Sequence, residues 1–448
     1  MKKLVLIIIL TLLFSGLSAQ NDTLPSLRQF FPDTCLQRLI TLALDSNIDL
    51  RIARERTLEA EASLLAARSA LFPKADLDAG TATQRFGSEN SSTHRINLVP
   101  SWEVDIFGRQ CNASRSAKAG LEAQQAYVLA VQTEMVATLA QSYYTLLMLR
   151  QQQRISRQSL VNWQQTEASL RALCDVGRTN EAAVLQARAN ILTLQSEIVA
   201  LQKNIQTTEN SLYTMLGVSS CEPTAALRLD GDSFSATLLF PQENMDTSLP
   251  VCDNVVMFSD GIQLKMLVNR PDVQMAQKQL EAAGFDVKVA RARFYPQITL
   301  SGIVGWTNEG LQVASPAQML LNVAGQLTMP MLNHGAVVAE NKAAESRRQQ
   351  AFLSFRKTLL AAGQEVNDAL ASYQAAQQQL DFTIQRISTL GEVVEKTRLL
   401  MQYSSTTYLE VLTAEQDFLS AQTTALEHQY SRTTALISLY KALGGGTE

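Results

Sequence analysis

The sequence contains few aromatic residues. They make up 6% of its 448 residues, whereas alanine, glutamine and leucine are abundant. This composition favours long helices over a compact core rich in aromatic side chains. The formal net charge is −4, which argues against a nucleic-acid-binding protein, because such proteins carry an excess of basic residues.

The residue types that usually hold metals or carry catalysis are scarce and scattered. The five cysteines are dispersed, odd in number and without a Cys-x-x-Cys pair, which argues against a disulfide framework or a zinc site. The three histidines lack partners at the spacing of a metal site or a triad. A phosphate-binding loop and a nucleophile elbow are also missing. We therefore expect no enzyme, no cofactor and no metal, with energy supplied by a partner.

Proline is missing from two long stretches. None occurs in residues 101–222 and none follows Pro330. Because proline strongly destabilises a helix interior, both stretches are free to form unusually long helices.

The apolar run at the N-terminus is too short to span a bilayer stably. Lys2 and Lys3 precede the run LVLIIILTLLF, and small residues follow up to Ala19. This pattern predicts a secretory signal peptide at residues 1–19. The first cysteine, Cys35, lies too far from that cleavage point to accept a lipid, so we expect an exported protein without a lipid anchor.

The sequence contains an internal repeat. The segment from Asn47 (NIDLRIARERTLEAEASLLAARSALFPKADLDAG) matches the segment from Arg270 (RPDVQMAQKQLEAAGFDVKVARARFYPQITLSG) at an offset of 223 residues. Later matches, such as LYTMLG from Leu212 with LYKALG from Leu439, have an offset of 227. We therefore predict an N-terminal segment (20–46), a first repeat (47–217), an inter-repeat segment (218–269), a second repeat (270–444) and a C-terminal tail (445–448).

Each repeat contains two stretches in which apolar and polar residues alternate, as in half-buried strands. We predict these strands at about 75–86, 95–106, 297–306 and 321–331, with polar hairpin loops that begin at Gly87 and Thr307. A strand of about ten residues suits a tilted crossing of a membrane. Four strands cannot close a barrel, and lipid does not tolerate an open sheet edge. We therefore expect the chain to oligomerise.

Long helices are predicted on only one side of the strands. One helix of each repeat ends before Pro73 or Pro296, and the next begins near Gly108 or Gly335. The second repeat keeps the glycine but lacks the acidic residues that precede Gly108. We therefore expect the glycine to matter more than the acidic pair for turning the chain.

The segment SWEVDIFGRQ, from Ser101, resembles the Trp-Glu-x-Asp-hydrophobic-Phe-Gly-Arg signature of the outer-membrane factors of tripartite efflux systems, the TolC family. The segment from Arg270, YLEVLTAEQDFLSAQ from Tyr408 and the terminal LYKALGGG resemble the branch partnered with pumps of the resistance-nodulation-division (RND) type. The resemblance covers nearly the whole mature chain. It implies a mixed α and β membrane protein, a homotrimer whose twelve-stranded outer-membrane β-barrel is continued by a periplasmic α-helical barrel. The inter-repeat segment would join an equatorial belt.

The resemblance implies a passive outer-membrane exit channel in a Gram-negative bacterium. Such a channel conducts drugs or other small toxic compounds that an inner-membrane RND pump and a periplasmic adaptor protein deliver. The outer duct of a type I protein-secretion system is an alternative. A periplasmic coiled-coil scaffold is a weaker one, because the paired strands and the duplication argue against it.

The resemblance also implies functional positions in this sequence. The turns farthest from the membrane would contact the adaptor, and ordinary interhelical turns are the alternative. A joint would connect the strands to the long helices. The adaptor-contact residues are Asp175, Gly177, Arg178 and Thr179 in the first turn and Ser404, Ser405 and Thr406 in the second; the joint residues are Trp102, Phe107, Gly108, Arg109 and Gly335.

Two further features have open interpretations. Glu410, Thr413 and Asp417 share a helix face, and family members often place acidic residues there at a periplasmic gate. Three converging carboxylates would attract cations, whereas the alternative is an ordinary solvated face. Trp102 and Trp306 lie near strand ends and suit a belt of aromatic residues at the membrane interface, with core packing as the alternative.

Overall fold

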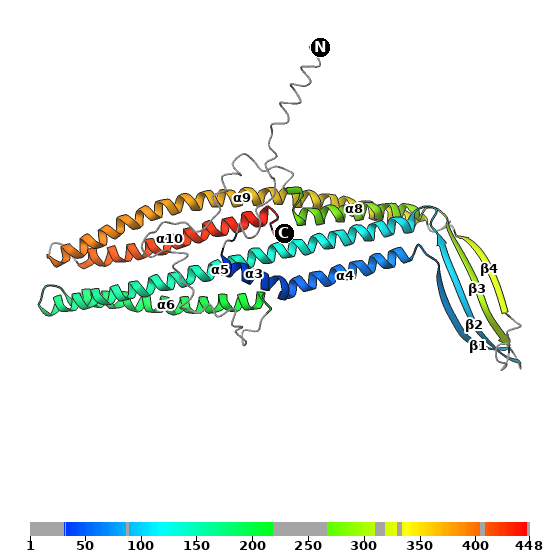
Figure 1. The fold of residues 1–448 in the computed structure, drawn as a ribbon, viewed down its shortest axis with the longest axis horizontal. Helices are drawn as coiled ribbons and strands as arrows, with labels where there is room; N and C mark the ends of the chain where they lie inside the picture. The colour runs from blue at the N-terminus through cyan, green and yellow to red at the C-terminus, as the bar shows by residue number, and fades with distance from the viewer. Residues whose placement is uncertain are drawn as a thin grey trace, which may run out of the picture.

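The computed structural model describes residues 31, 33–86, 89–217, 267–309, 319–328, 334–403 and 408–445. These residues form an elongated molecule with a four-stranded sheet at one end and helices that extend to the other end (Figure 1). Two helices run along this length, α5 (Arg109–Asp175) with 67 residues and α9 (His334–Gln402) with 69. At 1.5 Å per residue, each helix is about 100 Å long.

Shorter helices line the two long ones. Helices α4 and α6 lie along α5, and helices α8 and α10 lie along α9. The short α3 packs on α5. Their bounds are α3 Thr34–Ser46, α4 Ile48–Ser69, α6 Glu181–Met215, α8 Pro271–Ala292 and α10 Tyr408–Ala442.

The short helices of each repeat meet end to end near the middle of the molecule. In the first repeat, the Asn47 side chain caps α4 by accepting from the Leu50 N–H and donates to the Met215 carbonyl at 2.7 Å. In the second, buried Arg270 donates to the Ala442 carbonyl at 2.7 Å. Each contact pairs the start of one helix with a carbonyl at the end of the adjoining helix, where the helix itself leaves carbonyls unsatisfied.

The sheet is antiparallel in the order β1-β2-β3-β4, with bounds β1 Lys74–Phe86, β2 Glu89–Val104, β3 Gln297–Glu309 and β4 Met319–Thr328. The structure corrects the limits of the two hairpin loops that were predicted to begin at Gly87 and Thr307. β2 begins at Glu89, six residues before the predicted start at 95, and β3 continues to Glu309 instead of ending at 306. These extensions are polar, and their strand structure rests on backbone hydrogen bonds that need no apolar side chains.

The duplication is visible in the structure. Helices α4 and α8 both have 22 residues, and α6 and α10 both have 35. In the first hairpin Lys74 pairs with Ser101. Shifting these residues by 223 and 227 gives Gln297 and Thr328, and those two residues pair in the second hairpin. The two sequence offsets therefore describe equivalent positions in space.

The largest buried cluster lies where α3 packs against the middle of the molecule. It joins Leu36 of α3 to Leu139 and Tyr143 of α5, Leu212 of α6 and Tyr440 of α10. Within the described ranges, no helix combines the length and the apolarity needed to cross a membrane. The predicted signal peptide and most of the predicted inter-repeat segment lie outside the described residues.

Candidate functional site

The strand register places apolar residues of all four strands on one face of the sheet. Leu77, Leu98, Val304 and Leu321 pair in one row across it. Leu77 is 72% exposed and Leu98 46%, so no other described segment of this chain covers that face at these residues. An uncovered apolar band of this kind suits contact with lipid.

The opposite face of the sheet is polar. One row pairs Glu103 with Thr299 and continues to Gln326. Asp78 and Arg95 also lie on this face, where their charged groups are 3.3 Å apart. The sheet therefore separates an apolar surface from a hydrophilic one, as the alternation predicts.

Two acidic residues hold the joint between β2 and α5. The Arg109 guanidinium donates two hydrogen bonds to the Glu103 carboxylate, one of them from Nε at 3.0 Å. Oδ2 of Asp105 accepts from the Cys111 backbone N–H at 2.7 Å. Between them Gly108 has a φ of 73°, a left-handed conformation that glycine adopts readily and most other residues adopt only with strain. Carboxylates stabilise a helix start by satisfying its free N–H groups.

Gly335 does not repeat the role of Gly108. It lies inside the first turn of α9 rather than before it, and its φ is not positive. At the first joint, the positive φ of Gly108 and the carboxylates of Glu103 and Asp105 both take part, and the greater weight of the glycine stays a prediction. The residues just before His334 lie outside the described part of the chain.

Aromatic side chains gather at the helical end of the sheet. The Trp102 indole donates to the Leu71 carbonyl at 3.0 Å, which ties β2 to the end of α4. Phe107 stacks on Tyr295 with ring centroids 4.7 Å apart. Trp306 pairs with Ile96 near the other end of the strands, although its side chain lies outside the described residues.

The first predicted adaptor turn has a defined geometry. The Gly177 N–H donates to the Cys174 carbonyl and the Arg178 N–H donates to the Leu173 carbonyl, both at 2.9 Å. With a φ of 70° at Gly177, these bonds form a Schellman motif that ends α5. Asp175, Gly177 and Arg178 are exposed, and Thr179 is half-buried. The second predicted turn, with Ser404, Ser405 and Thr406, lies outside the described residues.

The three predicted gate residues lie on one exposed face of α10. Glu410, Thr413 and Asp417 are all exposed, whereas the intervening Val411 and Leu412 are buried. These residues lie near the start of α10, and α10 begins near the end of the molecule opposite the sheet (Figure 1).

Sequence reasoning missed the carboxylate that joins the two repeats near this end. Glu415 of α10 is 6% exposed and accepts two hydrogen bonds from Arg398 of α9, at 2.8 and 3.0 Å. Thr166 of α5 donates to the same oxygen at 3.1 Å. A signal was available, because position 415 falls on the buried side of α10 rather than on the side of Glu410. A charged residue at such a position is expected to have a partner.

The seam between the two repeats contains an ion pair closer to the sheet. Lys278 Nζ of α8 lies 2.6 Å from a carboxylate oxygen of Glu122 on α5. This contact lowers the pKa of the Glu122 carboxyl and raises the pKa of the Lys278 amine. Both side chains are partly exposed, so water screens the pair and its contribution to stability is small.

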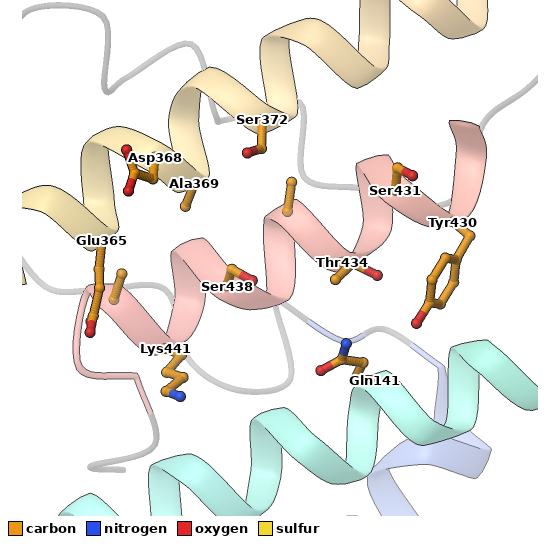
Figure 2. Close-up of a pocket in the computed structure, with 12 residues that line it drawn as sticks. Gln141, Glu365, Asp368, Ala369, Ser372, Tyr430, Ser431, Thr434, Ser438 and Lys441 are labelled. Carbon is orange, nitrogen blue, oxygen red and sulfur yellow. The ribbon is translucent and has the colours of Figure 1, made fainter. Parts of the chain in front are cut away.

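A cavity of about 510 Å³ opens along the same seam near the middle of the molecule. Figure 2 shows Glu365 and Asp368 of α9, Ser438 and Lys441 of α10, and Gln141 of α5 around it. Glu365 also accepts a hydrogen bond from the buried Arg270 at 2.7 Å. Among the described residues, no group of three or more histidine, cysteine or acidic side chains is placed to hold a metal ion.

Comparison with known proteins identifies similar chains over nearly the whole length. The model of the outer membrane efflux protein family matches residues 39–218 and 264–445. The probable outer membrane lipoprotein SilC of Salmonella typhimurium is 29% identical over 423 residues, 94% of this chain and 87% of SilC. The cation efflux system protein CusC of Escherichia coli K12 is 29% identical over 433 residues, 96% of this chain and 90% of CusC. A crystal structure of CusC has a TM-score of 0.83 at 27% identity and covers 95% and 96% of the two chains.

Proposed function

The chain belongs to the outer membrane efflux protein family, and we propose that three copies of it form the passive exit channel of a tripartite efflux system. The family consists of outer membrane channel proteins rather than enzymes. In the proposed assembly, an inner-membrane RND pump supplies the energy, and a periplasmic adaptor protein joins the pump to the channel. The channel lies in the outer membrane of a Gram-negative bacterium, with its helices in the periplasm.

One observation carries this proposal. A single chain has a four-stranded sheet with one uncovered apolar face, one polar face and two open edges, β1 and β4. Open edges cannot face lipid, because their backbone groups would lose hydrogen bonds. Three sheets joined edge to edge give a closed barrel of twelve strands, with the apolar face toward lipid and the polar face toward a water-filled interior.

The helices extend from only one end of the sheet (Figure 1). In the proposed channel they continue the barrel into the periplasm, with the predicted adaptor turns at the far end. The exposed acidic face of Glu410, Thr413 and Asp417 lies near these turns and would form the entrance gate. Trp102 and Trp306 would then mark the two interfaces of the membrane, because they lie near opposite ends of the strands.

The proposed substrates are drugs or other small toxic compounds. CusC is named for cation efflux, so toxic metal cations are to be tested beside organic compounds. In the proposed assembly, selection among these compounds is assigned to the pump.

A deletion strain tests the function. We expect loss of the gene to lower the tolerated concentration of at least one compound in a panel of drugs, solvents and metal salts. Expression of the intact chain should restore tolerance, and the chain should stay in the outer-membrane fraction after a high-salt wash. Unchanged tolerance together with release by salt would contradict an efflux channel and favour a periplasmic scaffold. If the deletion strain instead failed to secrete a protein, the result would favour the outer duct of a type I protein-secretion system.

A further inference from the structure

Three exposed basic residues of the first repeat lie where its helices approach the sheet. Arg68 is in the last turn of α4, and Arg115 and Lys118 are near the start of α5. Among the described residues, Arg68 and Arg115 have no ion pair. Lys118 lies 3.7 Å from Glu122, whose carboxylate is also 2.6 Å from Lys278. The described part of the chain therefore leaves most of this positive charge without a counter-charge.

The antiparallel packing of α4 and α5 brings the three residues to the same level. The Arg56 guanidinium of α4 lies 6.0 Å from the centroid of the Tyr127 ring of α5. Helix α4 runs toward the sheet and α5 runs away from it (Figure 1). Twelve residues toward the sheet along each helix, from 56 to 68 and from 127 to 115, lead to Arg68 and Arg115. Lys118 is three residues from Arg115 on the same side of α5, so the three basic groups form one cluster.

The second repeat has a carboxylate where the first repeat has an ammonium group. Arg291 of α8 donates to Glu345 of α9 at 3.0 Å. At offsets of 223 and 227, the repeat equivalents of these two residues are Arg68 and Lys118. Two like charges, which repel each other, thus replace an ion pair. The cluster lacks an anion, and Glu345 shows where the negative charge lies when one is present.

The basic residues of α5 are turned away from the polar side of the sheet. On that side, Glu103 holds Arg109 and Gln110 in the first turn of α5. Successive residues are about 100° apart around a helix. Arg115 therefore lies at least about 120° around α5 from both Arg109 and Gln110, and Lys118 lies about 180° from Arg109. Both basic residues face the same side as the apolar face of the sheet.

Arg68 lies on the apolar side as well. Trp102 belongs to the apolar face, and its indole donates to the Leu71 carbonyl at 3.0 Å. Arg68 is three residues before Leu71, on the same side of the chain end of α4. Leu65 and Phe72 flank Arg68 along the chain and are 67% and 69% exposed. Exposed apolar side chains beside basic ones suit a membrane interface, where the cationic groups reach the lipid headgroups.

We propose that Arg68, Arg115 and Lys118 bind the phosphate group of an anionic phospholipid in the periplasmic leaflet of the outer membrane. The leaflet follows from the helices, which all extend from this end of the sheet (Figure 1). A guanidinium can donate two parallel hydrogen bonds to phosphate oxygens, and the ammonium adds a point charge. This inference rests on the proposed placement of the sheet in the outer membrane, and it adds one lipid site to each copy of the chain.

Exchange of the two repeat equivalents tests the site. Lys118→Glu gives the first repeat the ion pair of the second, so we expect the chain to fold and the anion site to be lost. Glu345→Lys gives the second repeat the basic cluster of the first, because Lys342 is the equivalent of Arg115. Lys396→Glu is the matched control, since it makes the same change of charge at an exposed position near the far end of α9.

Native mass spectrometry measures the lipid that the intact protein retains in detergent after mixing with equal amounts of phosphatidylglycerol and phosphatidylcholine. We expect the parent protein and Lys396→Glu to retain phosphatidylglycerol preferentially, and Glu345→Lys to retain more of it than the parent. Each basic residue near an anionic lipid surface strengthens binding roughly fivefold. Because Lys118→Glu replaces a positive charge by a negative one, we expect it to bind phosphatidylglycerol at least about tenfold more weakly.

Equal retention of phosphatidylglycerol by the parent and Lys118→Glu would overturn the site, as would equal losses in Lys118→Glu and Lys396→Glu. Displacement of the lipid by inorganic phosphate would show a site for free phosphate and overturn the lipid assignment. If the parent retained no phosphatidylglycerol and Lys118→Glu dissociated the assembly, the cluster would belong to a contact between copies. The proposed function fails separately, because a parent protein that a high-salt wash releases from the outer-membrane fraction is not a membrane channel.

Discussion

The buried contact of Glu415 with Arg398 permits a quantitative prediction for the variant Arg398→Ala. Arg398 donates two hydrogen bonds to a carboxylate that is 6% exposed, and Thr166 is the other donor. Hydrogen bonds to charged groups contribute about 1.5–3 kcal/mol each. The Arg398 side chain is 43% exposed, so water replaces part of this energy and we expect a loss of about 2 kcal/mol in local stability.

Native-state hydrogen exchange measures this loss where it occurs. A change of about 2 kcal/mol corresponds to roughly 30-fold faster exchange of amides that open with this contact. The expected positions are residues 411–419 of α10, whereas the strands should not change. Replacing both Arg398 and Glu415 by methionine should restore most of the protection, because a buried charge is then no longer left without its partner.

A nearby exposed ion pair supplies the control. Lys396 and Glu392 lie 3.5 Å apart with side chains that are 73% and 67% exposed. Such a pair contributes little, so Lys396→Ala should leave exchange in α10 nearly unchanged. Equal effects of Lys396→Ala and Arg398→Ala, or no effect of Arg398→Ala, would refute the conclusion that the buried contact of Arg398 with Glu415 stabilises α10 here.

Three further predictions concern other parts of the chain. Gly108→Ala should destabilise the joint by about 1–2 kcal/mol, because alanine is strained at this positive φ, and a lower denaturation midpoint in detergent measures it; Gly120→Ala is the control. Glu410→Ala should weaken divalent-cation block of single channels if this carboxylate lines the gate, and unchanged block would remove it from the gate. Radioactive palmitate should not label the chain, because the first cysteine, Cys35, lies too far from the predicted cleavage after Ala19 to accept a lipid; labelling would contradict this expectation.

The sequence predicted the order of the elements well because its periodicities are long and regular. Two helical stretches without proline became α5 and α9, and the alternating stretches became strands. The extent of β2 was underestimated because its first residues are polar and resemble a loop. Backbone pairing with residues 81–86 of β1, across the tight hairpin, extends the strand through them, and this pairing needs no alternation of apolar and polar side chains.

The candidate site shows a similar limit. The exposed face of Glu410, Thr413 and Asp417 was readable from helical spacing alone. The roles of Asp105 and Glu415 were not, because each depends on a contact across a turn or between helices. Spacing predicts which side chains share a face, whereas their partners follow only from the packing of separate elements.

The number of copies in the assembly tests the central claim most directly. Native mass spectrometry of the intact protein, released from detergent micelles, compares the assembly with the mass of one denatured chain from the same sample. Three times that mass is the expected result, because three four-stranded sheets close the barrel. A single chain or a pair as the largest species would contradict the account, since neither gives twelve strands.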